Sequence, residues 1–232
     1  MRDVNVNANE RGVQRLFAPE KSKLRLSPRL SLFTKRTLDI LVSAVALLVL
    51  APLILMTSAI LLLIQGRPIF IAHRRVGRGG GMFPCLKFRT MVNNNEALLE
   101  KYLAANPAEQ AEWAATRKLR NDPRITPFGA FLRKSSIDEI PQLINVVLGH
   151  MSMVGPRPIV PSETVYYGQN YADYIRVRPG LTGLWQVSGR SDADYVKRVQ
   201  LDALYVANRS LVGDLVIMVK TIPAVLHARG SY

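Results

Sequence analysis

The feature that most constrains this chain is an uninterrupted apolar run over residues 40–64, ILVSAVALLVLAPLILMTSAILLLI, which contains no charged residue. A helix needs roughly 20 apolar residues to cross the hydrocarbon core of a bilayer, so this run is long enough to do so. A secretory signal peptide is excluded, because the polar leader is too long and no small-residue cleavage site follows a short apolar run. The run therefore predicts a membrane helix.

Pro52 divides the run near its middle, and basic residues flank both ends. As helix, each half of about 12 residues would measure roughly 18 Å, against a hydrocarbon core of about 30 Å. The flanking cations are Arg29, Lys35 and Arg36 before the run and Arg67, Arg74, Arg75 and Arg78 after it. Since Lys and Arg favour the cytoplasmic side, a re-entrant helix that breaks at Ala51-Pro52 and returns satisfies both observations. A spanning helix with a proline kink is the alternative, because neighbouring groups can satisfy the freed carbonyl.

The chain around this run is expected to have three parts. Residues 1–33 are polar and basic without a sustained period, which predicts a largely disordered N-terminal arm. Residues 34–66 form the membrane helix hairpin, and residues 67–232 form a cytoplasmic domain. Within that domain, the apolar segment 211–226 is interrupted by charges and a proline, which predicts a packed helix or one lying in the membrane interface.

The domain that follows the membrane helix begins with a hairpin pattern. Residues 68–91 read as a strand, a glycine-rich turn and a second strand, and residues 93–120 read as a helical excursion. The expected fold class is α/β, mostly helical with a small β-hairpin or sheet element, on a monotopic membrane protein with one re-entrant helix.

The charge balance points to polyanionic partners. Lys and Arg total 31 against 17 Asp and Glu, a net charge of +14, which suits nucleic acid, anionic lipid or phosphorylated substrates. Nucleic acid is disfavoured, because the basic residues lack interleaved aromatics or a recognition-helix pattern. The single cysteine, Cys85, excludes an internal disulfide, and the three scattered histidines show no zinc spacing.

Two adjacent carboxylates, Asp138 and Glu139, stand in the stretch SSIDEIPQL at residues 135–143. A helix from about 137 to 148, with Pro141 in its first turn, would place both acids on one polar side. That side would hold Asp138, Glu139, Gln142 and Asn145, opposite an apolar face of Ile137, Ile140, Leu143, Ile144, Val147 and Leu148. The simpler alternative is a capping box of Ser136 and Glu139, with Asp138 complementing the helix dipole.

Basic residues in Gly/Pro-punctuated loops favour a chemical role for these acids. A carboxylate pair can hold a divalent cation that meets a phosphate, and a carboxylate can attack phosphorus to give an acyl phosphate. Both roles need cations nearby to neutralise the transferring group. The candidate phosphate-binding cations are Lys87, Arg89, Arg133, Arg157, Arg178 and Arg190.

Three long motifs closely resemble the bacterial sugar transferase family. They are KFRTM at residues 87–91, DPRITPFGAFLRKSSIDEIPQLINVVLGHMSMVGPRP at residues 122–158, and RPGLTGLWQVSGR at residues 178–190. The resemblance covers roughly residues 34–226, and the motifs occur in the family's order. These enzymes are monotopic polyprenyl-phosphate phosphoglycosyl transferases, which begin exopolysaccharide, capsule and O-antigen assembly.

The resemblance implies a mechanism and a location. Asp138 would attack the β-phosphorus of a UDP-sugar and release UMP, and undecaprenyl phosphate would then take the phosphosugar. Asp138 and Glu139 would hold Mg²⁺, with Lys87, Arg133 and Arg157 on basic positions of the site. The resemblance also implies a re-entrant helix broken at Pro52 and a site on the cytoplasmic face of the bacterial inner membrane.

This sequence departs from the family pattern at His150, where the family usually has an acid. It also lacks the extra N-terminal spanning helices of the larger members, and its form resembles the rhizobial exopolysaccharide-initiating type, with galactose or glucose as the sugar by analogy. Anionic inner-membrane lipid is an expected partner of the basic arm, and a homo-oligomer is left open. The alternative from another class is a basic membrane-tethered binding or scaffold protein without catalysis.

Overall fold

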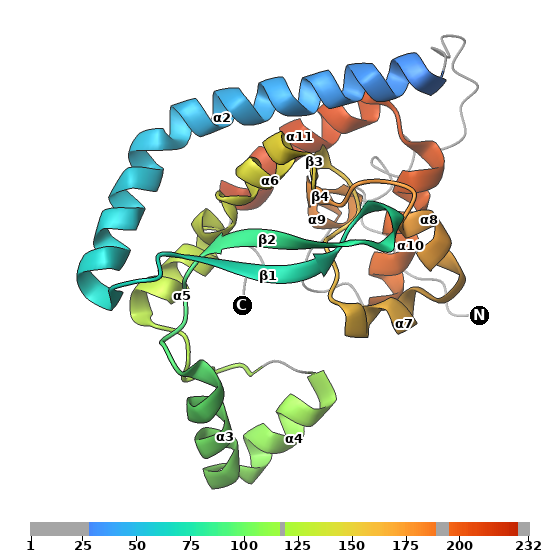
Figure 1. Cartoon of the computed structure of the whole chain (residues 1–232). Helices are drawn as coiled ribbons and strands as arrows, with labels where there is room; N and C mark the ends of the chain where they lie inside the picture. The colour runs from blue at the N-terminus through green and yellow to red at the C-terminus, as the bar shows by residue number, and fades with distance from the viewer. Residues whose placement is uncertain (1–27, 117–118, 189–194, 227–232) are drawn as a thin grey trace.

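The computed structural model describes residues 28–116, 119–188 and 195–226. The longer elements and the strands follow in chain order (Figure 1): α2 (Pro28–Gln65), β1 (Phe70–Val76), β2 (Met82–Phe88), α3 (Asn95–Ala105), α4 (Pro107–Thr116), α5 (Pro127–Lys134), α6 (Gln142–Leu148), β3 (Ser152–Val154), β4 (Gly180–Thr182), α10 (Tyr195–Asn208) and α11 (Leu211–Leu226). Short helical turns fill the connections: η1 (Arg78–Gly80), η2 (Ile137–Glu139), η3 (Pro161–Glu163), α7 (Thr164–Tyr167), η4 (Gly168–Asn170), α8 (Tyr171–Tyr174) and α9 (Leu184–Val187).

The described part is mostly helical with two small two-stranded sheets, so the α/β expectation is confirmed. Strands β1 and β2 pair antiparallel from Phe70 opposite Phe88 to Val76 opposite Met82, with the glycine-rich turn between them as predicted. Strands β3 and β4 pair parallel across a helical crossover, with Ser152 opposite Gly180. Each has only three residues, too few for an alternating pattern to reveal them in the sequence.

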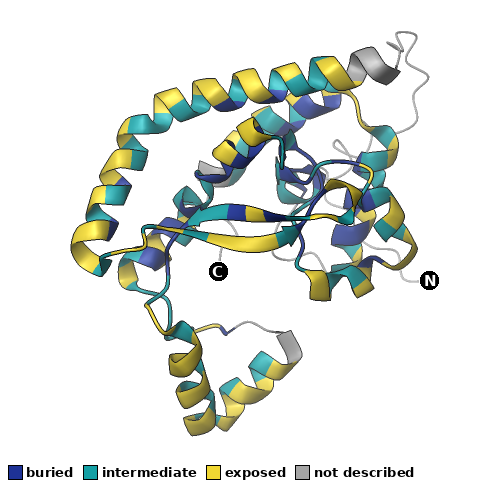
Figure 2. Cartoon of the chain, viewed as in Figure 1, coloured by how far each residue is buried: buried dark blue, intermediate teal, exposed yellow. Residues whose placement is uncertain are grey.

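Helix α2 is one continuous 38-residue helix that contains Pro52 and begins six residues before the expected position 34. Its ribbon bends and arches over the domain, from the blue N-terminal part to the cyan C-terminal part (Figure 1). By length and composition, Leu32–Gln65 is able to cross a membrane. Much of its outer side is exposed (Figure 2), although the residues there are apolar, such as Leu48 and Leu63.

The inner side of α2 is the more polar one. Asp39, Ser43 and Thr57 are buried against the domain, whereas the exposed side is apolar. Asp39 accepts hydrogen bonds from the Ser152 hydroxyl at 2.8 Å and from the Met153 backbone N–H at 3.1 Å. This arrangement reverses that of a helix on a water-soluble protein and suits an apolar solvent outside.

Both ends of α2 contact the same domain. Near the N-terminal end, the Arg36 guanidinium donates to the carbonyls of Val146 and Val147 at 2.7 and 2.9 Å. At the C-terminal end, the Gln65 amide donates to the Thr126 hydroxyl at 2.9 Å. Nearby, Leu61 packs in a buried cluster with Phe88 and Leu132. The domain therefore holds the helix at two separate places.

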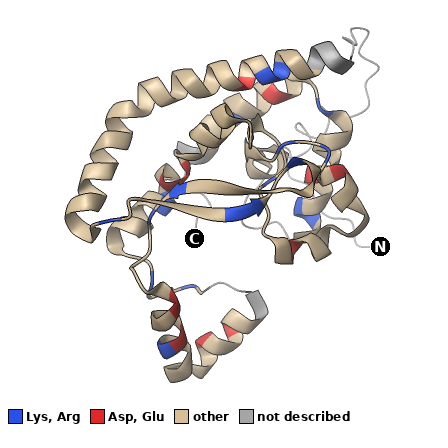
Figure 3. Ribbon diagram, in the orientation of Figure 1, with Lys and Arg blue, Asp and Glu red and all other residues tan. Residues whose placement is uncertain are grey.

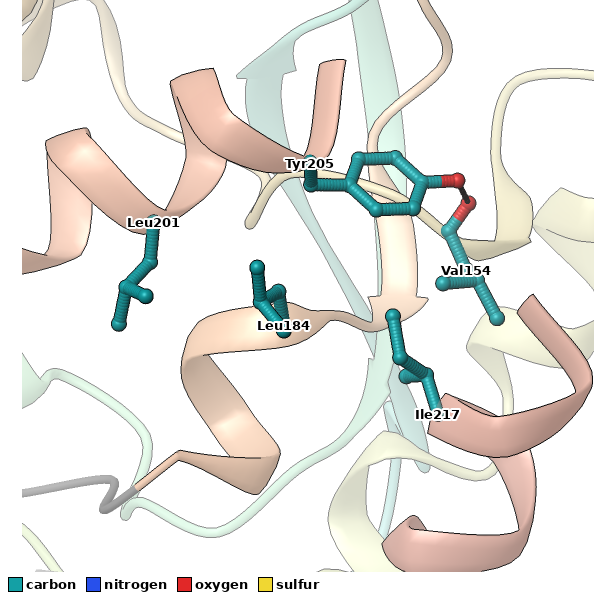
Figure 4. Close-up of a cluster of buried hydrophobic side chains, with 5 residues drawn as sticks. All are labelled: Val154, Leu184, Leu201, Tyr205 and Ile217. Atoms are coloured by element: carbon teal, nitrogen blue, oxygen red, sulfur yellow. Dashed lines mark hydrogen bonds between the residues drawn. The ribbon is translucent and has the colours of Figure 1, made fainter. Parts of the chain in front are cut away.

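One buried cluster joins the short parallel sheet to the C-terminal helices. Figure 4 shows its members, Val154, Leu184, Leu201, Tyr205 and Ile217, converging from β3, α9, α10 and α11. The Tyr205 hydroxyl donates to the Val154 carbonyl at 2.9 Å, which satisfies a buried backbone acceptor. Segment 211–226 forms helix α11. Ile217 on this helix is buried, whereas Val212, Leu215, Val219 and Ile222 are exposed.

Candidate active site

The two predicted acids meet a lysine from the hairpin. Lys87 lies one residue before the end of β2, and its Nζ is 2.7 Å from Glu139 Oε1 and 3.4 Å from Asp138 Oδ2. Both carboxylates therefore converge on one positive centre. In Figure 3, acidic and basic segments lie side by side where β2 approaches the connection from α5 to α6. The Asp138 side chain is 10% exposed and that of Glu139 is 32% exposed, so Asp138 is the more enclosed of the pair.

The predicted helix 137–148 is divided, which corrects the sequence interpretation. The acids lie in the 3₁₀ turn η2, and α6 begins only at Gln142, after Pro141. Pro141 has no N–H to donate, which disfavours one continuous helix through this position. Ser136 has a left-handed backbone with φ of 58°, and its side chain makes no capping hydrogen bond. The capping-box alternative is therefore wrong in its geometry.

The polarity of α6 also differs from the expectation, although Leu143 of the expected apolar face is buried. Gln142 and Asn145 are buried, whereas Ile144, Val147 and Leu148 of the expected apolar face are 39%, 37% and 62% exposed. The Asn145 amide takes the place of a strand neighbour for β2. Its oxygen accepts from the Leu86 N–H at 2.8 Å, and its nitrogen donates to the Pro84 carbonyl at 2.7 Å. The sequence analysis placed Asn145 on the polar side of the expected helix but gave it no role. In the structure, its side chain fixes α6 and the preceding acids on the strand that carries Lys87.

The surroundings of Asp138 set its electrostatics. Burial raises the pKa of Asp138, and the Glu139 charge adds to that rise, while Lys87 and Arg133 oppose it. Burial alone would lower the pKa of Lys87, but the charges of Glu139 and Asp138 outweigh it and raise that pKa. Lys87 therefore stays protonated at neutral pH. A partly desolvated carboxylate beside a fixed cation is suited to attack on a phosphorus centre.

Two of the predicted arginines join this group. Arg133 lies in the last turn of α5, its charge acts on the pKa of Asp138, and its Nε donates to the Thr90 hydroxyl at 2.9 Å. Arg157 lies near enough for its charge to act on the pKa of Lys87. Its guanidinium carbon is 5.6 Å from the centre of the Trp185 ring, which holds the cation by a cation–π contact.

A buried acid behind Arg157 was missed by the sequence analysis. Asp202 on α10 is 2% exposed, and the Tyr167 hydroxyl donates to its Oδ2 at 2.8 Å. Burial raises the pKa of Asp202 to about 7, against the Tyr167 hydrogen bond and the charges of Arg198 and Arg157. The only signal in the sequence is a single acid inside the otherwise apolar stretch LDALYV.

The other predicted cations lie elsewhere. Arg89 is buried at the C-terminal end of α2, where it donates to the carbonyls of Gln65 and Gly66. Arg178 donates from Nε to the Gly149 carbonyl at 2.7 Å, in a basic pocket that is also lined by Arg36 and Arg78. Arg190 falls outside the described residues. Of the six candidates, Lys87, Arg133 and Arg157 are therefore brought to the dyad.

His150 follows the C-terminal end of α6. Its Nδ1 is 3.4 Å from the Asn145 amide nitrogen, and its ring centre is 5.8 Å from that of Phe83. Its contacts are therefore with the residue that positions α6. Among the residues that the structure describes, no group of three or more His, Cys, Asp or Glu side chains could hold a metal ion.

The fold and the site together define an enzyme with a long apolar helix and a carboxylate dyad, set among cations suited to transfer of a phosphorylated group. Comparison with known proteins agrees. A family model described as bacterial sugar transferase matches residues 30–228. The exopolysaccharide production protein ExoY of Rhizobium meliloti is 52% identical over 198 residues, which cover 85% of this chain and 88% of the relative.

Two further relatives carry names that describe a reaction. Undecaprenyl-phosphate galactose phosphotransferase of Salmonella typhimurium is 47% identical over 94% of this chain, although the match covers only 46% of that longer protein. UDP-glucose:undecaprenyl-phosphate glucose-1-phosphate transferase of Caulobacter vibrioides is 36% identical over 85% of this chain and 72% of the relative. The chain belongs to the bacterial sugar transferase family, and it is a phosphoglycosyl transferase.

Proposed function

We propose that this enzyme transfers a hexose-1-phosphate, galactose or glucose, from a UDP-sugar to undecaprenyl phosphate and releases UMP, as the first membrane step of exopolysaccharide synthesis. The observation that carries the proposal is the convergence of Asp138 and Glu139 on Lys87, with Arg133 and Arg157 close by. The names of the relatives support the donor and the acceptor.

The reaction proceeds in two displacements at one phosphorus atom. An oxygen of Asp138 attacks the β-phosphorus of the UDP-sugar, the bond to the bridging oxygen breaks, and UMP leaves with the electron pair. An oxygen of undecaprenyl phosphate then attacks the phosphosugar on Asp138, and the carboxylate leaves as it was. Lys87, Arg133 and Arg157 stabilise charge on the transferring group. The products are UMP and undecaprenyl diphosphate hexose.

The dyad fits Mg²⁺, which the proposal includes as the cofactor. Mg²⁺ is usually bound by one or two carboxylates together with substrate phosphates. Asp138 and Glu139 already converge on a cation, the Lys87 ammonium, and they are the residues that would hold the ion. When bound, Mg²⁺ would neutralise phosphate charge.

Trapping the covalent phosphosugar tests this function. Labelled UDP-sugar without lipid acceptor should leave label on the denatured protein, and hydroxylamine should remove it. Asp138→Asn should lose both labelling and turnover while keeping its fold. Asp173→Asn, at an exposed ion pair with Arg176, should label as the parent does. If UMP appears only with acceptor and no label can be trapped, the two-step mechanism is wrong, and release of UDP would indicate an ordinary glycosyl transferase.

We also propose that α2 enters and leaves the inner membrane on the cytoplasmic side. The attachment of both ends of α2 to one domain supports this topology, because a helix held at both ends by one domain cannot place its N-terminal end across a core of about 30 Å. The exposed apolar sides of α6 and α11 would then face lipid. A site at this surface can receive a soluble UDP-sugar and a lipid phosphate.

Cysteine accessibility tests the topology. In a Cys85→Ser background, a cysteine in place of Ser22 should be protected from a membrane-impermeant reagent in intact cells. Replacing Ala51 and Pro52 by leucine favours a straight helix, and it should expose the same cysteine and reduce activity. Labelling in the parent background would show that α2 spans the membrane.

A further inference from the structure

A cavity of about 460 Å³ lies at the C-terminal end of α2, separate from the dyad. Its apolar wall is formed by Ile64 from α2, Val92 after β2, and Pro127 and Phe128 at the start of α5. Next to Ile64, Leu63 is 85% exposed on the outer side of α2. The apolar wall therefore continues into the surface that the proposed topology places in lipid.

The polar wall of this cavity contains a buried cation. Arg89 is 4% exposed, and it has no carboxylate partner among the described residues. Its hydrogen bonds go to the carbonyls of Gln65 and Gly66 and to the Asn93 side chain, and its Nε has no partner. The carbonyls at the C-terminal end of α2 offset part of the Arg89 charge. Because its buried Nε still lacks an acceptor, this wall is suited to an anionic group.

Thr90 connects the cavity to the dyad. Arg89 precedes Thr90 in the chain, and on the other side the Thr90 hydroxyl accepts from Arg133, whose charge acts on Asp138. Helix α5 packs closely here, because a Cβ at Gly129 would collide with the Thr90 backbone. The Thr126 N–H also donates to the Thr90 carbonyl at 3.1 Å. The cavity and the catalytic group are therefore neighbours across a single, tightly packed residue.

We propose that this cavity binds the first isoprene units of the polyprenyl phosphate acceptor, with the phosphate end directed toward Thr90 and Arg133. The proposal rests on the function proposed above and assigns the acceptor its own place. The acceptor has an anionic head and an apolar tail. The cavity combines a cation that has no carboxylate partner among the described residues with an apolar wall that continues to the lipid-facing side of α2. Arg89 attracts the phosphate during entry, and the tail leaves the cavity past Ile64 into the membrane.

Filling the cavity from two sides tests the proposal. Val92→Trp adds a larger side chain from the segment after β2, and Ile64→Trp adds one from α2. Because Ile64 is 65% exposed, tryptophan at this position does not need to fit into the protein core. Val165→Trp on α7 is the matched control, because Val165 is 73% exposed and does not line the cavity. The full-length proteins in detergent are compared in two separate assays.

The first assay measures labelling of the protein by UDP-sugar without acceptor, and the second measures transfer against the concentration of undecaprenyl phosphate. Both cavity variants should raise the KM for the acceptor by about tenfold or more and leave labelling within about twofold. With a phosphorylated acceptor of only two isoprene units, the KM should rise in the cavity variants by the same factor as with undecaprenyl phosphate. The control should change neither assay.

Three results would overturn the proposal. One is an unchanged acceptor KM in both folded variants, and another is an equal loss in both assays. The third is competition by added phosphatidylglycerol in the parent that disappears in Val92→Trp, which would make an ordinary phospholipid the occupant. If the parent forms no labelled protein, the proposed two-step function fails instead, and the acceptor KM from overall turnover still tests the cavity.

Discussion

Replacing Asn145 by leucine should weaken both the fold and the first catalytic step. The Asn145 side chain is fully buried and makes two hydrogen bonds to β2, with the Leu86 N–H and the Pro84 carbonyl. Leucine can make neither bond. An unsatisfied buried backbone group costs about 1–3 kcal/mol, and the Pro84 carbonyl costs less because Pro84 is an exposed residue. The expected loss of unfolding free energy is therefore about 2–4 kcal/mol in total.

For a chain of this size, that loss corresponds to a decrease in Tm of about 5–15 °C. The matched control is Asn208→Leu, because the hydrogen bond that the Asn208 amide makes within the described residues goes to the Leu204 carbonyl four residues earlier on the same helix, at 3.2 Å. Its Tm should fall by less than about 3 °C. Both variants are measured by thermal unfolding in one detergent at one scan rate, together with the parent.

Activity gives an independent readout of the same contact. Since Asn145 holds α6 and the acids before it against the strand of Lys87, its loss should slow labelling by UDP-sugar on the order of 10- to 100-fold at a temperature where the variant is folded. Parent-like Tm and labelling rate in Asn145→Leu would refute the assignment of Asn145 as the residue that positions the dyad.

Three further changes address the charges of the site. Lys87→Met removes a cation that lowers the pKa of Asp138, so the acid limb of the pH–rate profile for labelling should move to higher pH, and an unmoved limb would contradict the pairing. Arg157→Ala should reduce labelling at least about 100-fold. Arg120→Ala removes the same charge at an exposed position and should reduce labelling less than about threefold. Equal losses in the two variants would show that net charge alone matters. The pKa of Asp202 is raised to about 7 from about 3.9 in an unfolded chain, so its contribution to stability is lost as pH rises between these values. Asp202→Asn should therefore flatten the dependence of Tm on pH in that range. An unchanged slope would contradict the raised pKa of the buried Asp202 carboxyl.

Local patterns in the sequence predicted the elements whose cause is local. The hairpin follows from strand residues around a glycine turn, and α11 coincides with the apolar segment 211–226. The apolar run predicted a long membrane helix because its length and lack of charge suffice for that conclusion. The acidic pair and Lys87 were singled out from their residue types and positions, the family resemblance gave them roles, and the structure brings the three together.

Periodicity failed at α6 because it assumes that apolar residues face the protein core. Here Asn145 is buried because its side chain hydrogen-bonds to the backbone of β2, and Ile144 and Leu148 are exposed. The same assumption would have misplaced the polar side of α2, where Asp39 is buried against β3. In a protein whose surface meets lipid, an apolar side chain can be stable on the outside, so the pattern alone does not reveal the direction of a face.

The sequence by itself determined that this chain has one long apolar helix, a basic surface and an acidic pair among phosphate-binding motifs, since these depend on composition and short spacing. Only the tertiary structure decided which cations reach that pair. Lys87 and Arg89 are two residues apart in the sequence, yet Lys87 binds the dyad and Arg89 binds the end of α2. Residues two apart in a strand point to the same side, but β2 ends at Phe88, so Arg89 lies beyond the strand and its partners depend on segments far away in the chain. Turn η2 brings the acids to Lys87, and the C-terminal end of α2 supplies the carbonyls that bind Arg89.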